Sequence, residues 1–153
     1  MISDPLPLAG LLETGVAIMV ATRDANLRTH VTRGWGGYLD GETGRLVLAL
    51  TGYPGSRVVT NLESNGQIAI NLARPLNYQS MQLKGVVDSI GDCSDEQLSR
   101  VRAHIARFVE EGELVGSPSV IARLAGSEFV QVRVVPSHSY EQTPGPSAGA
   151  ELR

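Results

Sequence analysis

The chain contains one cysteine, few aromatic residues and no long apolar run. Its single cysteine, Cys93, cannot form an internal disulfide, and its three histidines are too scattered for a metal-ligand motif. No histidine lies at a spacing that would make Cys93 a nucleophile. No stretch approaches the roughly 18 consecutive apolar residues of a membrane span. The amino-terminal region lacks the basic and apolar parts of a signal peptide, so we expect a cytoplasmic location and no membrane partner.

Several common functional motifs are also missing. The net charge is −3 and no block of like charge occurs, which argues against nucleic acid as a partner. There is no G-x-G-x-x-G motif, no P-loop, no Ser-His-Asp set and no evident carboxylate pair. The sequence offers groups that suit an anion but no clear acid, base or nucleophile. This combination indicates that a cofactor performs the chemistry.

The composition is that of one globular domain. The chain has 153 residues, of which 42% are hydrophobic and 19% are charged, enough to bury a sizeable core. We expect an amino-terminal segment at 1–14, a barrel domain at 15–136 and an extended tail at 137–153. The tail is rich in proline, glycine and serine.

Six segments have the apolar or alternating pattern of β-strands. They are 16–24, 27–35, 45–50, 67–73, 78–90 and 128–136. Short turns at 24–26 and 38–44 predict hairpins in the first half, and Gly85 predicts a bulge or a close backbone approach. A small domain with six short, hairpin-linked strands favours a mainly β fold, a closed six-stranded antiparallel barrel without free edges.

Helical patterns separate these strands. Ser94 and Gln97 match a capping box, which predicts a long helix over 95–111 that ends at Gly112. A shorter helix over 57–64 is predicted between the third and fourth strands, and a third helix between Ser117 and Gly126. On the long helix, four charged residues are predicted to form a solvated face. They are Arg100, Arg107, Glu110 and Glu111.

The second predicted strand carries an unusual charge. Alternation places Arg28 and His30 on one face, and Arg33 on the other face beside Val31 and Trp35. A guanidinium among apolar neighbours needs a partner, because an unpaired buried charge is costly. An anionic ligand would satisfy Arg33. A distant glutamate, or extension of the side chain to water, would satisfy it equally well.

The start of the short helix is a second candidate for anion binding. Helix amino termini carry free N–H groups and the positive end of the helix dipole. Ser56 adds a hydroxyl there, and Arg57 adds a fork of donors that suits phosphate. An ordinary cap with an exposed arginine is the alternative. Trp35 is predicted to be a core residue, and Tyr53 and Tyr78 either adjoin a ligand or cap the barrel.

The order of these motifs resembles the pyridoxamine 5′-phosphate oxidase-like, FMN-binding split β-barrel family. The similar segments are VAIMVATRD, LRTHVTR, RLVLALTG, SRVVTNLESNGQIAIN and MQLKGVV, within about residues 15–88. The resemblance implies a homodimer with two FMN sites at its interface. It also implies that a later strand of the partner subunit contributes a glutamine, for which Gln82 is the nearest match and Ser80 the alternative. The implied cofactor-binding residues are Arg28, Arg33, Thr51, Ser56, Arg57 and Gln82.

The sequence also departs from that family. Val58 stands where a second basic residue usually follows Ser-Arg, and the long helix is an addition to the smallest members. The substrate-binding residues of the oxidase itself are not recognisable, so pyridoxamine phosphate is not the expected substrate. Relatives that bind other flavins, F420 or haem are part of the same resemblance.

Three functional hypotheses follow. The first is an FMN-dependent oxidoreductase with an unknown small-molecule substrate and electron donor. The second is a flavin- or haem-binding protein without turnover, for which His30 or His138 would be the candidate haem ligand. The third is a barrel that has lost its cofactor and serves a structural role.

Overall fold

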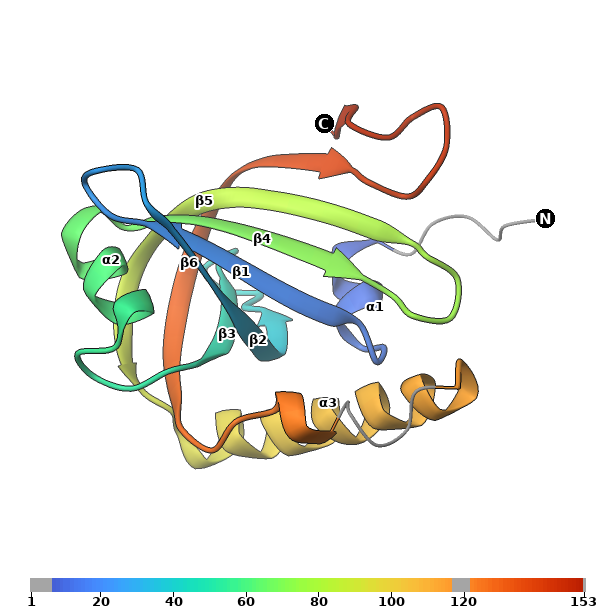
Figure 1. Ribbon diagram of the computed structural model, residues 1–153, viewed down its shortest axis with the longest axis horizontal. Helices are drawn as coiled ribbons and strands as arrows, with labels where there is room; N and C mark the ends of the chain where they lie inside the picture. The colour runs from blue at the N-terminus through green and yellow to red at the C-terminus, as the bar shows by residue number, and fades with distance from the viewer. Residues whose placement is uncertain (1–6, 117–121, 153) are drawn as a thin grey trace.

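The computed structural model describes residues 7–116 and 122–152 and shows a closed antiparallel β-barrel (Figure 1). The strands are β1 (Ala17–Arg23), β2 (Thr29–Leu39), β3 (Leu46–Thr51), β4 (Gln67–Ala73), β5 (Ser80–Asp92), β6 (Phe129–Glu141) and β7 (Glu151–Leu152). Neighbouring strands follow the order β3-β2-β1-β4-β5-β6, and β3 pairs with β6 to close the barrel. The predicted six-stranded antiparallel barrel is therefore confirmed, and β7 is an additional short strand paired with β6.

In residues 7–116 and 122–152, three α-helices and a short 3₁₀ helix accompany the barrel. They are α1 (Leu8–Leu12), α2 (Arg57–Asn65), α3 (Asp95–Leu114) and η1 (Ala122–Leu124). In Figure 1, α2 lies at one end of the barrel and α3 runs along one side. Within the described ranges, no helix has both the length and the apolar character needed to cross a membrane.

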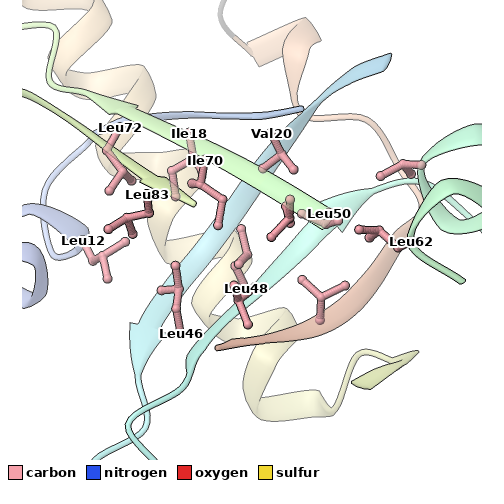
Figure 2. Packing of buried hydrophobic residues seen from close by; sticks show 14 of the residues in the cluster. Leu12, Ile18, Val20, Leu46, Leu48, Leu50, Leu62, Ile70, Leu72 and Leu83 are labelled. Atoms are coloured by element: carbon pink, nitrogen blue, oxygen red, sulfur yellow. The ribbon is translucent and has the colours of Figure 1, made fainter. Parts of the chain in front are cut away.

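The barrel is filled by aliphatic side chains from β1, β3, β4, β5 and β6. Figure 2 shows Ile18 of β1, Leu48 of β3 and Ile70 of β4 meeting in one interior cluster. Leu62 of α2 and Leu12 of α1 join this cluster from the two short helices. Burial of branched side chains stabilises the fold by about 1.5–3 kcal/mol each, so this cluster supplies the main driving force for closure.

Helix α3 packs on the outside of β2 through a second, smaller core. Trp35 makes edge contacts with His104 and Phe108, at 5.6 Å between ring centroids in both cases. Gly36 has a φ of +59°, a conformation that favours glycine, and its backbone is bound by two helix side chains. Its N–H donates to His104 Nδ1 at 2.9 Å, and its carbonyl accepts from Gln97 Nε2 at 3.0 Å.

Several local predictions need correction. Strand β2 continues to Leu39, because the irregularity between Trp35 and Tyr38 allows pairing with β3 to resume beyond it. Gly112 does not end α3, which continues to Leu114. Glu111 is not solvated: it is 8% exposed and forms an ion pair with Arg74, which lies after β4.

Other local predictions are confirmed. Ser94 Oγ accepts from Gln97 N–H at 3.1 Å at the start of α3. The pairing of β5 with β6 shifts register between Lys84 and Gly85, as expected for a bulge. The predicted end of the last long strand at Pro136 is wrong: β6 extends five residues further, to Glu141, because its second half pairs with the first half of β5. The predicted Ser117 start of the third helix lies outside the described residues.

Candidate functional site

Two neighbouring cavities meet at the amino-terminal end of α2. The first, which we name the Thr51 cavity, has a volume of about 490 Å³. The second, the Arg28 cavity, has a volume of about 460 Å³. Arg57 lines both cavities and therefore joins them into one candidate site. Their other principal lining residues are His30, Thr51, Tyr53, Ser56 and Glu128 for the first, and Asp24, Arg28, Gly55, Thr60 and Asn61 for the second.

The two arginines of this site, Arg28 and Arg57, have no carboxylate partner among the described residues. Arg23 and Arg33 of the barrel strands share this property, whereas Arg45, Arg74 and Arg133 each pair with a carboxylate. Both arginines of the site line the Arg28 cavity. A concave surface with two uncompensated positive charges favours an anionic ligand.

The carboxylate of Asp24 also lines the Arg28 cavity, but one of its oxygens already accepts hydrogen bonds from the backbone of the β1–β2 turn. Asp24 Oδ1 accepts hydrogen bonds from the backbone N–H groups of Asn26 at 2.8 Å and Arg28 at 2.9 Å. This arrangement is the side-chain-to-backbone turn expected for an aspartate between two strands. It fixes the backbone of Arg28 at the entrance of β2, so the turn positions the arginine.

The start of α2 is arranged differently from the prediction. Ser56 occupies the cap position, but its hydroxyl accepts from Tyr53 N–H at 3.2 Å and makes no cap bond to the helix. The first-turn N–H groups consequently have no side-chain acceptor, which leaves them available to an anion. Val58 is 1% exposed and packs in the barrel core, so Arg57 is the only basic residue in the first turn of α2.

Thr51 lies in the wall of the cavity with its hydroxyl proton already engaged. Its Oγ1 accepts from Trp35 Nε1 at 3.0 Å and donates to the carbonyl of Ala125 at 3.1 Å. The hydroxyl therefore has one lone pair left for a ligand and no proton to donate. Gly126 has a φ of +72°, and a Cβ there would approach Thr51 Cγ2 to 2.6 Å, so only glycine fits at this point of the wall.

The remaining two predicted site residues lie elsewhere on this chain. Arg33 is half-buried outside the barrel, with its guanidinium carbon 5.9 Å from the centroid of the Phe108 ring, and burial lowers its pKa. Gln82 lies on the outer face of β5, in register with Asn71 of β4 and Tyr140 of β6. The structure thus brings together Arg28, Thr51, Ser56 and Arg57, whereas Arg33 and Gln82 line neither cavity.

Three further residues with polar side chains, His30, Tyr53 and Glu128, line the Thr51 cavity. His30 belongs to the same strand face as Arg28, and this alternation was a signal in the sequence that it would lie near the site. Tyr53 lies in the loop before α2 and is 53% exposed. Glu128 arrives from the segment before β6, and nothing local in the sequence indicates this long-range contact.

No protein-family model matches the chain, and no curated protein matches it. Solved structures do match. An F420 reductase is 23% identical with a TM-score of 0.56, and the match covers 88% of this chain and 97% of that one. HupZ of Group A Streptococcus is 16% identical with a TM-score of 0.54, covering 97% and 100%. HutZ, described as the heme storage protein of Vibrio cholerae, is 20% identical with a TM-score of 0.50, covering 86% and 89%.

These similarities show a shared fold. The class that the architecture defines is the six-stranded antiparallel barrel with helices at one end and along one side. The F420 reductase and HupZ share this fold with the chain, and the sequence resemblance to the pyridoxamine 5′-phosphate oxidase-like split barrels predicts it.

Proposed function

We propose that this protein is an FMN-binding flavoprotein that acts as an oxidoreductase on a small molecule. The observation that carries the proposal is the convergence of Arg28 and Arg57, neither of them in an ion pair with a described residue, on a cavity at the start of α2. FMN combines a dianionic phosphate with a flat ring system. Each of the two joined cavities has a volume within the range usual for ligand sites, about 300–1,000 Å³. One cavity is lined by charged groups that suit a phosphate, and the other has apolar and aromatic walls that suit a ring.

The two parts of FMN suit different cavities. The Arg28 cavity offers two guanidinium groups and the Thr60 side chain, so we assign the phosphate to it. The Thr51 cavity includes Val58, Gly126 and Tyr53 among its walls, so we assign the ring to it. When bound, FMN supplies the electron transfer. The chain's own residues would hold the phosphate, orient the ring and exclude water.

We further propose that two copies of the chain form a homodimer with a site at each side of the interface. Met19 and Val31 are 37% and 52% exposed on the outer face of β1 and β2. Gln82 lies on the outer face of the same barrel wall, two strands from β1. A partner packed on this wall would cover the apolar side chains and allow its Gln82 to reach the neighbouring site. A measurement of mass in solution for wild type and Val31→Glu tests this, and a monomeric wild type would contradict it.

A haem-binding protein is the second candidate function. HutZ is described as a heme storage protein, and it shares the fold with this chain. His30 is the candidate haem ligand that lines the Thr51 cavity. His138 lies exposed on β6, with its ring 6.4 Å from that of Tyr140, and lines neither cavity.

An absorbance spectrum of the purified protein, with and without added FMN, separates these candidates. Flavin bands that are released on denaturation support the first function, and a Soret band supports the second. Arg57→Ala should weaken FMN binding at least tenfold, since a charged hydrogen bond contributes about 1.5–3 kcal/mol. Arg45→Ala is the matched control, because Arg45 pairs with Asp88 away from both cavities. Equal FMN affinity in wild type and Arg57→Ala would contradict the assignment.

A further inference from the structure

Among the side chains of the Thr51 cavity, only an imidazole exchanges protons near neutral pH, and its ring is free to bind a ligand. His30 is half-buried, and within the described part of the chain neither of its ring nitrogens has a hydrogen-bond partner. The other two histidines differ, because both ring nitrogens of His104 are bonded and His138 Nδ1 contacts Ser137.

The other polar groups of this cavity cannot perform the same role. The hydroxyl proton of Thr51 is donated to Ala125. Of the side-chain types that line this cavity, imidazole is the one whose ordinary pKa lies near neutral pH. His30 is therefore the one side chain of the Thr51 cavity able to be a cation in one solution and a neutral donor and acceptor in another.

We propose that His30 binds FMN directly in the Thr51 cavity and couples FMN binding to the uptake of a proton by its imidazole. This inference rests on the proposed function. The groups that act on His30 are Arg57 and Glu128, which line its cavity, and Arg28, which lies two residues earlier at the start of β2.

The ligand changes this balance in one direction. A bound phosphate would neutralise Arg28 and Arg57, and the flavin ring would supply carbonyl and nitrogen acceptors for the imidazole. Both effects favour the imidazolium, so the complex holds the His30 proton more tightly than the free protein does. By linkage, FMN binding must then strengthen as the pH falls through the range in which the free imidazole titrates. No electron transfer or bond cleavage is involved in this step.

The test is the FMN dissociation constant of wild type and His30→Gln across the range from about pH 8 to about pH 6. The FMN phosphate also titrates in this range, but its contribution is common to both proteins and cancels in the ratio of the two constants. We expect this ratio, variant over wild type, to rise about tenfold on acidification, as for the gain of one charged hydrogen bond. His138→Gln is the matched control, with a ratio that stays constant.

Two results would overturn the inference, and they differ from each other. If wild type and His30→Gln both bind FMN with a ratio that is independent of pH, the role of His30 is wrong and the FMN site stands. If wild type binds no FMN at any pH, the proposed function is wrong and the inference is wrong with it. His30→Asn serves as a second variant, and thermal unfolding of each protein without FMN shows whether the replacement disturbs the fold.

Discussion

His104 and Glu111 beside α3 differ from the polar side chains at the α2 end of the barrel in whether the chain itself supplies their hydrogen-bond partners. Under α3, His104 is fully buried, with one ring nitrogen bonded to Gly36 and the other to Val16. Glu111 accepts there from Arg74 and from the backbone of Gly15. At the α2 end, Arg28, Arg57 and His30 are more exposed, and their side chains form no ion pair or hydrogen bond with any described residue.

The difference shows which polar residues serve the fold and which are available to a ligand. Partners inside the chain consume the bonding capacity of His104 and Glu111, so their chemistry stabilises the packing of α3. The groups at the α2 end keep their capacity, and they line concave surface. Spare polar capacity is not confined to this end, because Arg100 and Arg107 of α3 each have a buried guanidinium nitrogen without a partner among the described residues and line a smaller cavity. The α2 end adds the free first-turn N–H groups of a helix to its unpaired side chains, and this combination marks the candidate site.

The largest effect should come from breaking the ion pair under α3. Glu111→Ala would leave Arg74 and the Gly15 N–H without their acceptor, at a cost of about 3–5 kcal/mol, as for one partner of a buried pair. Urea unfolding measures this loss. Asp88→Ala removes a pair whose side chains are 37% and 35% exposed, and should cost less than about 1 kcal/mol. Similar losses in both variants would show that the burial of Glu111 is unimportant.

Acid should weaken the same region through His104. Desolvation by burial lowers its pKa from 6.5 to about 4, and its Nδ1 accepts from Gly36 N–H, which a protonated nitrogen could not do. The unfolded chain therefore binds the proton first. Stability is present above pH 6.5 and is lost as the pH falls towards about 4, by up to about 1.4 kcal/mol per pH unit.

The measurement is the free energy of unfolding between about pH 6.5 and about pH 5, above the range in which carboxylates ordinarily titrate. His104→Gln should be less stable than wild type at neutral pH and should show a flatter dependence on pH. Equal slopes in the two proteins would mean that another group causes the acid loss.

A smaller effect is expected where the two regions meet. Trp35→Phe keeps an aromatic ring between His104 and Phe108 but removes the N–H that donates to Thr51 Oγ1. One neutral hydrogen bond contributes about 0.5–1.5 kcal/mol, so a loss of this size in urea unfolding is expected. Thr51→Ser keeps the hydroxyl and its two bonds, and serves as the control. A Trp35→Phe protein as stable as wild type would show that the bond contributes nothing.

The sequence predicted the barrel well because its information is local. Alternation identified six strands, and the turns between them imposed antiparallel hairpins. Ser94 and Gly85 were interpreted correctly because a cap and a bulge depend on the residues beside them.

What the sequence could not predict depends on distant contacts. Glu111 was assigned to a solvated face, because nothing near it shows that Arg74 lies opposite. An ordinary side-chain cap was one of two interpretations of Ser56, but the turn at Tyr53 competes for its hydroxyl. In the candidate site, too, the local features were predictable and the distant contacts were not. Alternation and the helix start indicated Arg28 and Arg57, whereas the walls formed by Gly126 and Glu128 required the closed barrel.

The most direct test of the central claim compares FMN with riboflavin, which lacks the phosphate. If Arg28 and Arg57 are the unpaired charges that hold a phosphate, wild type should bind FMN at least tenfold more tightly than riboflavin, since a charged hydrogen bond contributes about 1.5–3 kcal/mol. Arg57→Ala should lose most of that preference while its riboflavin affinity changes little. Equal affinity of wild type for the two ligands, or a preference that survives in Arg57→Ala, would contradict the assignment of the phosphate site.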